Sequence, residues 1–282
     1  LIIPKDFTLI GAANTNIIIK NKGLIISKSP INLIGKKDSP IIISAQNSGQ
    51  GIAVLNAQRN SNIEYVHFDG LSSPIDELWS LTGAITFYNS PVSISNCIFS
   101  NINAEDTINI VKSRFSFKKS QIIHSKSDSI DLDFSDGIIE DISIINAGND
   151  GIDVSGSNVQ LNYVSIHGAG DKALSIGEEG NLFASNIEIK DAEIAFASKD
   201  KSKIIADSIS VINSKVGFVV FEKKPEYSSA NMYISNASIE NVETPYLLEP
   251  NSNLTINEKK YKANVENVES LLYGVQYGRK SD

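Results

Sequence analysis

The sequence predicts an all-β chain folded as a parallel β-helix, a solenoid that completes one coil in about 22 residues. Three observations predict this fold: apolar residues that recur at a nearly constant interval, apolar and polar residues that alternate with period two, and polar turn residues between short apolar runs. The most regular apolar column advances by 23 residues once and by 22 thereafter, and consists of Ile85, Ile108, Ile130, Ile152, Leu174, Phe196 and Phe218.

Two further columns and one row of turns support the same interval. The second column lies two residues after the first and is apolar except at one position: Phe87, Ile110, Leu132, Val154, Ile176, Ser198 and Val220. The third comes from the other half of each repeat: Phe99, Ile122, Ile144, Ile166, Ile189, Val211 and Ile239. Predicted turns recur at Asn96, Lys119, Asp141, Tyr163, Asn186, Ser208 and Asn236. A unit this small cannot cover its own apolar face, so copies must stack. Leucine-rich repeats are disfavoured because Ile and Val dominate over Leu.

The repeat predicts one solenoid domain over residues 1–245, followed by a cap and tail of the same domain over residues 246–282. Two insertions interrupt the spacing: residues 71–82, which contain Trp79, and residues 222–231, which contain Tyr227. We expect the C-terminal segment to cover the open end of the last coil, whose backbone groups would otherwise be unpaired. The chain begins inside an apolar segment without Met, so we expect it to be part of a larger multidomain chain.

Composition excludes several classes of partner. The chain has 282 residues, of which 41% are hydrophobic and 21% charged, and this is typical of a globular protein. Its net charge of -8 argues against nucleic acid as a partner, because nucleic acids bind faces rich in Lys and Arg. No apolar run approaches the roughly 20 residues needed to cross a bilayer, so we expect no membrane insertion. The single cysteine, Cys97, is expected to be a buried apolar residue.

The repeats, the Asn and Ser turns and the NDGID segment resemble the right-handed parallel β-helix superfamily, which has the pectate-lyase-like fold. Members of that superfamily include lyases, hydrolases and epimerases of polysaccharides. The resemblance implies a right-handed coil, a polysaccharide or surface glycan as partner, and an extracellular or cell-surface location. LTGAITFYNSPVSISNCIFSN and GDKALSIGE are also similar to bacterial β-helix proteins found beside spore-coat-protein-H-like kinases, a likeness that carries no mechanism.

A row of aspartates follows from the predicted register. If Ile130 and Leu132 point inward, Asp131 and Asp133 point outward, and Asp153 lies beside Asp131 one coil later. Three turn positions next to this row also carry Asp and the fourth carries Lys: Asp106, Asp128, Asp150 and Lys172. Each of these turn aspartates has an alternative interpretation, in which it only bonds to its own backbone.

Stacked carboxylates repel by about 1 kcal/mol in water and by more at a partly buried surface. Three factors can offset this repulsion: a neighbouring Lys172 or Lys199, a raised pKa on one acid, or a bound metal ion. Oxygen ligands of this type suit Ca²⁺, so the sequence predicts a calcium site at Asp128, Asp131 and Asp153.

The favoured function is recognition of an extended glycan along this outward face. The predicted binding residues are polar residues of the face together with aromatic residues at its edges and in the insertions: Asn109, Asp131, Asp133, Asp153, Tyr88, Trp79 and Tyr227. Phe221 is expected to add a stacking surface at the other end of the face.

A polysaccharide-processing enzyme is the alternative. A lyase or epimerase would use Lys172 or Lys199 as a base and Ca²⁺ to neutralise a uronate carboxylate. A glycoside hydrolase is less favoured: Asp150 in GNDGID matches one motif of the polygalacturonase type, but Lys172 occupies the place of a second acid. The three histidines, His67, His124 and His167, are predicted to lie on the other half of the coil.

Overall fold

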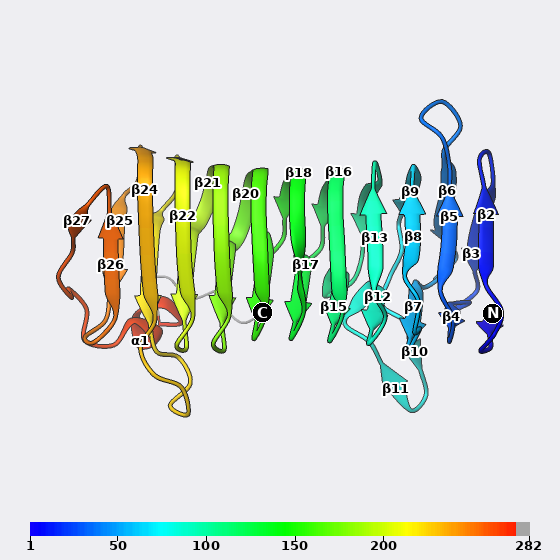
Figure 1. Ribbon diagram of the computed structural model, residues 1–282, viewed down its shortest axis with the longest axis horizontal. Helices are drawn as coiled ribbons and strands as arrows, with labels where there is room; N and C mark the ends of the chain where they lie inside the picture. The colour runs from blue at the N-terminus through cyan, green and yellow to red at the C-terminus, as the bar shows by residue number, and fades with distance from the viewer. Residues whose placement is uncertain (275–282) are drawn as a thin grey trace.

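A computed structural model describes residues 1–274 of the chain, and it is a right-handed parallel β-helix of about 11 coils with about 23 residues in each. The coils stack along one axis from the N-terminal to the C-terminal end (Figure 1). The predicted fold class is therefore confirmed. No helix among the described residues is long and apolar enough to span a membrane.

Each coil contributes to three parallel sheets, which we call face 1, face 2 and face 3. Face 1 contains the strand of each coil that carries the aspartate row, and its members are β1 (Ile2–Ile3), β4 (Ile25–Ser27), β7 (Ile52–Leu55), β12 (Gly83–Tyr88), β15 (Asp106–Val111), β17 (Asp128–Asp133), β19 (Ile152–Ser155), the ends of β20 (Asn158–Gly177) and β21 (Asn181–Lys199), β23 (Val216–Phe221) and β25 (Thr244–Leu248).

Faces 2 and 3 complete the coil. Face 2 begins with β2 (Leu9–Ala12), β5 (Ile31–Ile34), β8 (Ser61–Glu64) and β13 (Val92–Ser95). Face 3 begins with β3 (Asn16–Lys20), β6 (Ile41–Gln46), β9 (Val66–Asp69) and β14 (Ile98–Ile102). From β16 (Arg114–Ser125) onward the two faces are joined in single long strands, which also include β18 (Asp136–Ala147), β22 (Lys203–Ile212) and β24 (Asn231–Glu240).

The predicted register is confirmed on face 1. Ile85, Ile108 and Ile130 are paired across adjacent strands, and the column continues to Phe218. Ser198, the polar exception, is fully buried, and its hydroxyl lies 2.9 Å from that of Ser202. Ile239 keeps the predicted register, since it pairs with Val211, but it is 39% exposed because it lies near the C-terminal end of β24, where no later coil pairs with it.

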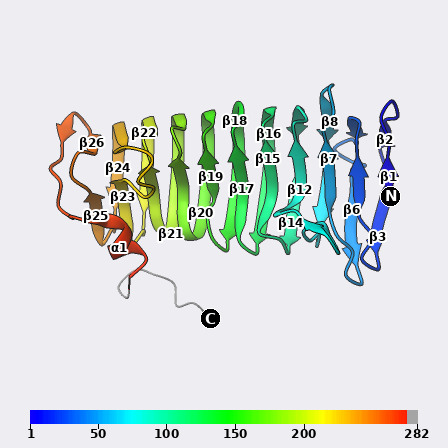
Figure 2. The ribbon, with the colours of Figure 1, turned by 90° about the horizontal axis from the view of Figure 1, so that it is seen from below.

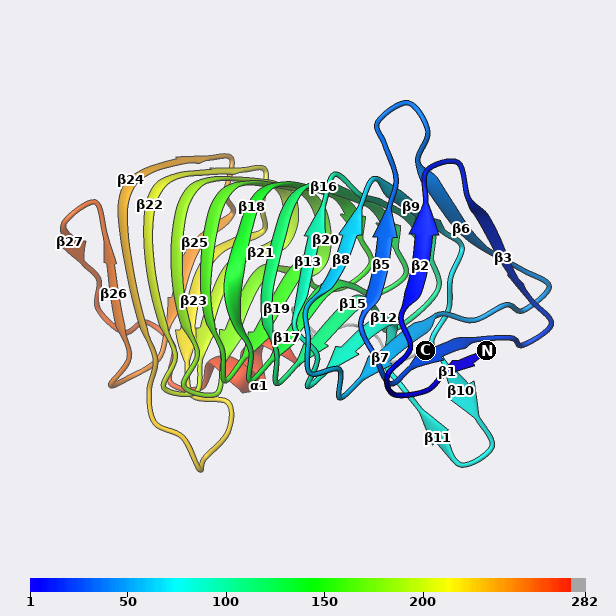
Figure 3. The same ribbon diagram turned by 45° about the vertical axis from the view of Figure 1, so that its right-hand side comes forward.

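Left-handed backbone forms the corners. All seven predicted turn residues have φ between +48° and +58°. Asn is among the residues that best tolerate this region, which explains its frequency there. A second corner, between face 3 and face 1, escaped the sequence analysis and contains Asn101, His124, Asn146, Gly168, Asp191, Asn213 and Asn241. These corners bend the long strands around the core (Figure 3).

Two insertions and the C-terminal segment project from the regular coils. Residues 71–82 form a hairpin of β10 (Ile75–Asp76) and β11 (Trp79–Ser80), and the loop after β23 projects from the same side of the molecule further along the axis (Figure 1). Parallel pairing continues through β26 (Asn253–Ile256), and β27 (Lys259–Lys260) then runs antiparallel to β26. The chain ends its described part with α1 (Val268–Leu272), which lies across the strands of face 1 (Figure 2).

Candidate functional site

The outward column of face 1 brings the predicted aspartates together. Asp131 and Asp153 are direct partners in the pairing of β17 with β19, so the predicted vertical row is confirmed. Asn109 precedes Asp131 in the column, and its side-chain amide donates to Asp131 Oδ2 at 2.7 Å. Ser175 follows Asp153 one coil later.

The turn aspartates form a second row that ties adjacent coils together. Asp128 Oδ1 accepts hydrogen bonds from the backbone N–H of Asp150, at 2.9 Å, and from the side-chain amide of Asn149, at 2.7 Å. Asp150 Oδ1 accepts in the same way from the backbone N–H of Lys172, at 2.9 Å. These bonds tie Asp128 and Asp150 to the next coil, not to their own turns as the structural alternative expected, and they leave the second oxygen of each carboxylate outside these bonds.

Two buried lysines neutralise part of the row. Lys172 Nζ contacts the carboxylate of Asp171 and lies 3.6 Å from Asp150 Oδ1. Lys199 Nζ donates to Ser175 Oγ at 2.9 Å and lies 3.7 Å from Asp153 Oδ1. Burial acts to lower the pKa of both lysines, but the neighbouring aspartates raise each pKa above its ordinary value. Both amines are therefore protonated at neutral pH.

Gly177 allows Lys199 to reach the row. A Cβ on Gly177 would lie 2.8 Å from Lys199 Cε, so the aliphatic stem of the lysine passes directly over the bare glycine backbone. This is a close approach that any side chain at position 177 would obstruct. The stem leads the ammonium group back from its own coil toward Ser175 and Asp153.

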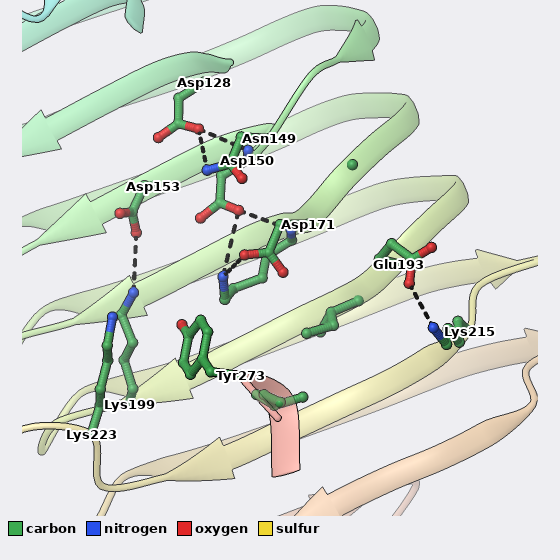
Figure 4. A pocket seen from close by; sticks show the side chains of 14 residues that line it. Asp128, Asn149, Asp150, Asp153, Asp171, Glu193, Lys199, Lys215, Lys223 and Tyr273 are labelled. Atoms are coloured by element: carbon green, nitrogen blue, oxygen red, sulfur yellow. Dashed lines mark hydrogen bonds and ion pairs between the residues drawn. The ribbon is translucent and has the colours of Figure 1, made fainter. Parts of the chain in front are cut away.

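A pocket of about 590 Å³ opens over these residues (Figure 4). The carboxyl groups of Asp128, Asp150 and Asp153 lie on one side of the sheet, with Tyr273 beside them. The ammonium groups of Lys172 and Lys223 lie 6.0 and 5.1 Å from the centre of the Tyr273 ring. The complete lining is Asp128, Asn149, Asp150, Asp153, Gly170, Asp171, Lys172, Glu193, Ile194, Lys199, Lys215, Lys223, Leu272 and Tyr273.

Two aspartates of this pocket have opposite pKa shifts. Burial raises the pKa of Asp150 to about 7, although Lys172 acts to lower it. Burial also acts to raise the pKa of Asp153, but Lys199, a hydrogen bond from Ser175 and Lys172 together bring it below its ordinary value. At neutral pH one carboxyl group is therefore partly protonated while its neighbour is ionised.

The aspartates toward the N-terminal end of the row have raised pKa values. Burial, followed by repulsion from Asp106, Asp133 and other acids, holds the pKa of Asp131 well above its usual range. Burial raises the pKa of Asp106 to about 7 and also raises that of Asp133. Asp106 Oδ2 is buried without a hydrogen-bond partner.

The structure places the predicted site residues in three groups. Those predicted to be catalytic, together with two of the predicted metal ligands, line the pocket: Lys172, Lys199, Asp150, Asp128 and Asp153. Three predicted binding residues lie on face 1 toward its N-terminal end, outside the pocket lining: Asn109, Asp131 and Asp133. The predicted aromatic residues are also outside this lining: Tyr88, Trp79 and Tyr227.

The expectation that Phe221 adds a stacking surface is wrong. It is fully buried in a cluster with Val219 and residues of α1, so it offers no stacking surface. The pocket instead uses Tyr273, from a segment that was expected only to cap the coil, and Lys223, from the insertion that contains Tyr227. Neither follows the 22-residue interval, so the repeat gave no signal for them.

The histidines lie outside the pocket, and the predicted metal site has no support from the side-chain geometry. His67 lies on β9 of face 3, His124 at a corner, and His167 pairs with Glu188 at 3.0 Å, so none lines the pocket. Among residues 1–274, no group of three or more His, Cys, Asp or Glu side chains is arranged to hold a metal ion. Calcium at Asp128, Asp131 and Asp153 stays a prediction.

Comparison with known proteins supports the fold. No protein-family model and no curated protein matches the chain. Among solved structures, the catalytic domain of a GH87 alpha-1,3-glucanase in complex with nigerose matches with a TM-score of 0.50 and 10% identity, over 91% of this chain and 63% of the glucanase chain. An alginate lyase from Paenibacillus sp. str. FPU-7 matches with a TM-score of 0.46 and 12% identity, over 88% of this chain and 99% of the lyase.

A third match is the A-module of a mannuronan C-5 epimerase from Azotobacter vinelandii, with a TM-score of 0.31 and 12% identity, over 88% of this chain and 91% of the module. At these identities the likeness concerns the fold alone. The match to the glucanase domain, at a TM-score of 0.50, agrees with the parallel β-helix fold that the repeats predicted.

Proposed function

We propose that the pocket on face 1 binds a polysaccharide or surface glycan, in a protein located outside the cell or on its surface. The observation that carries the proposal is the convergence of Asp150, Asp153, Lys172 and Lys199 with the ring of Tyr273 around one cavity. Sugar hydroxyls are both donors and acceptors, and they match a wall of fixed carboxylates and ammonium groups. An aromatic ring supplies an apolar surface with defined geometry for the sugar face.

The charge of face 1 favours a neutral glycan over a uronate. Lys172 and Lys199, two of the four lysines that line the pocket, are already engaged by aspartates, and the adjoining part of the face carries Asp106, Asp131 and Asp133. The repulsion between acids that helps to raise the pKa of Asp131 would also act on a polymer with one carboxylate on each sugar. We therefore expect neutral glucans or mannans to bind more tightly than alginate or polygalacturonate.

Calorimetric titration with oligosaccharides of each of these four polymers tests the proposal. Tyr273→Ala should weaken binding by at least about tenfold, because it removes a central aromatic contact. Tyr163→Ala is the matched control, since Tyr163 is 61% exposed at the corner between faces 2 and 3, away from the pocket. The proposal fails if no oligosaccharide binds, or if the two variants lose affinity equally.

Hydrolysis of a glycosidic bond is the second candidate, and the opposite pKa shifts of Asp150 and Asp153 favour it. Glycoside hydrolases pair a protonated acid with an ionised carboxylate. Asp150, with a pKa of about 7, would protonate the leaving oxygen, and the ionised Asp153 would act on the opposite side of the sugar. The protonated state of Lys172 and Lys199 disfavours the lyase alternative, because an ammonium group cannot accept a proton.

Release of reducing sugar from the polymer that binds would measure this activity. The rate should decline as the pH rises through about 7, where Asp150 loses its proton, and should decline at low pH when Asp153 gains one. Asp150→Asn and Asp153→Asn should each abolish turnover while the glycan still binds. Absence of turnover in the wild-type protein would eliminate hydrolysis and leave glycan binding as the function, and unchanged turnover in either variant would show that the substituted aspartate does not carry the reaction.

A further inference from the structure

Between the coil of Ala53 and that of Val219, the outward column that contains Asp131 is accessible to solvent only at Asp131 and Asp153. On an uncovered sheet face every outward side chain would be in contact with solvent. Here Asp131 and Asp153 are half-buried, whereas the members of the column on both sides of them are almost or completely buried: Ala53 at 0%, Thr86 at 2%, Asn109 at 5%, and Ser175, Ala197 and Val219 at 0% exposure. The exposed part of the row is therefore short.

Helix α1 closes the C-terminal end of this accessible stretch. Ala197 and Val219 pack in one apolar cluster with Val268 and Leu272 of the helix. The outward column changes from polar to apolar at Ala197, the coil at which this cover begins. A glycan lying along face 1 therefore cannot continue past Ser175.

Helix α1 and Tyr273 form a closing wall at this end of the pocket, and Tyr273 is held in place from two sides. The Tyr273 ring lies against Lys172 from the floor of the pocket and Lys223 from the loop after β23. That loop is itself tied to the coil, because Asp200 Oδ1 accepts hydrogen bonds from the backbone N–H groups of Lys223 and Lys224, each at 2.7 Å. The wall is therefore part of the folded structure of the pocket.

The dimensions of the site fit a short ligand. Adjacent strands lie about 4.8 Å apart, so a stretch that includes Asp131 and Asp153 with half a spacing on each side is roughly 10 Å long. The pocket volume of about 590 Å³ falls within the range that encloses a small-molecule ligand. The neighbouring outward column stays accessible at Tyr88, Val111, Asp133 and Ser155, so a bound chain can leave the pocket toward the N-terminal coils, whereas α1 closes the C-terminal direction.

We propose that this site recognises the end of a glycan chain, about two or three terminal sugars, and excludes internal stretches. The proposal rests on the proposed function and narrows it to one class of ligand. The terminal sugar would lie against Leu272 and Tyr273, and the chain would leave the face at the coil of Asp131.

The experiment uses a neutral glucan in linear fractions of increasing length, immobilised at equal sugar mass. A tenfold longer chain has about tenfold fewer ends, so we expect about tenfold less bound protein if ends are recognised. In solution, affinity for oligosaccharides should rise up to about three sugars and then stay constant. Bound protein that is independent of chain length, with affinity still rising at six sugars, would overturn the proposal.

A helix variant gives a second, independent measurement. Val268→Asp places a charge in the apolar contact of α1 with face 1, where Val268 is fully buried, and should displace the helix. Ser270→Asp adds the same charge on the exposed side of that helix and is the control. We expect Val268→Asp to reduce the dependence of binding on chain length, and Ser270→Asp to keep it.

The outcomes separate this proposal from the one on which it rests. If the wild-type protein binds none of the glucan fractions, both the proposed function and the end recognition are wrong. If it binds them in proportion to sugar mass, glycan binding is retained and only end recognition is wrong. If Val268→Asp unfolds the protein, as circular dichroism would show, the length series with the wild-type protein decides alone.

Discussion

Face 1 contains two neighbouring groups of aspartates that differ in their partners. The acidic group, Asp106, Asp131 and Asp133, forms no ion pair within the described residues 1–274. The lysine-paired group, Asp150, Asp153 and Asp171, contacts Lys172 or Lys199. The pKa values of the first group are all raised, whereas in the second group the pKa of Asp150 is raised to about 7 and that of Asp153 is lowered.

One repeat interval produces two different chemical environments on face 1. The 22-residue interval places like charges beside one another in both groups, and repulsion between them has to be offset in each. In the acidic group the raised pKa values allow protonation to offset part of the repulsion, and in the lysine-paired group an ammonium ion contacts the carboxylates. The lysine-paired group is therefore the one that keeps an ionised carboxylate available to a ligand at neutral pH.

The largest expected effect is that of removing the ammonium group of Lys199. Lys199→Met retains most of the side-chain volume but leaves Asp153 buried without its cation, so we expect a loss of about 3 kcal/mol in the free energy of unfolding. Urea denaturation at pH 7 measures this loss. Lys201→Met is the control, because Lys201 pairs with Glu179 at the exposed surface, where we expect less than about 0.5 kcal/mol. Equal losses would show that Lys199 contributes only surface attraction.

The second largest expected effect is a change in the pH dependence of protein stability when Asp106 of the acidic group is replaced. The pKa of Asp106 is raised to about 7 in the folded state, so the folded state retains this proton where the unfolded chain has lost it. The wild-type protein therefore loses stability as the pH rises from about 4 to 7, and Asp106→Asn should lose less. Melting temperatures measured across this range test the difference. Asp207 lies at an exposed site on face 2 and has a lowered pKa, so the control variant Asp207→Asn should not flatten the pH profile.

A smaller effect should follow from Gly177→Ala. The new methyl group would meet Lys199 Cε and displace the ammonium group from Ser175 and Asp153, so we expect a loss of about 1 kcal/mol. The loss should nearly disappear in the background of Lys199→Met, because the obstructed contact is then absent. Additive losses in this double-mutant cycle would mean that Gly177 does not act through Lys199.

Much of face 1 could be predicted from the sequence because stacking in a solenoid converts sequence spacing into spatial contact. The pairing of Asp131 with Asp153, and the approach of Lys172 and Lys199 to the row, follow from the interval and from period-two alternation. These positions depend on neighbours one or two coils away, at known separations in the chain. The insertions also disturb the interval, so their bounds were visible.

The position of α1 and Tyr273 over face 1 could not be predicted from the repeat interval. Tyr273 lies about 100 residues after Lys172 in the sequence, outside any repeat, and α1 is a helix of 5 residues whose two buried side chains make no periodic pattern. The apolar change at Ala197 and Val219 was present in the sequence as a loss of polarity in the outward column. It signalled that something covers the face, without indicating which segment does so.

The smallest expected effect is that of calcium. Lys199 neutralises Asp153 and protonation offsets the charge of Asp131, so little uncompensated charge is left between them for a divalent ion. We expect added CaCl₂ to shift the melting temperature by less than about 1 °C relative to EDTA. A larger rise that Asp131→Ala combined with Asp153→Ala removes would instead establish the calcium site predicted from the sequence. It would also mean that metal binding displaces both the proton of Asp131 and the contact of Lys199 with Asp153, so the two aspartate groups would act as one site.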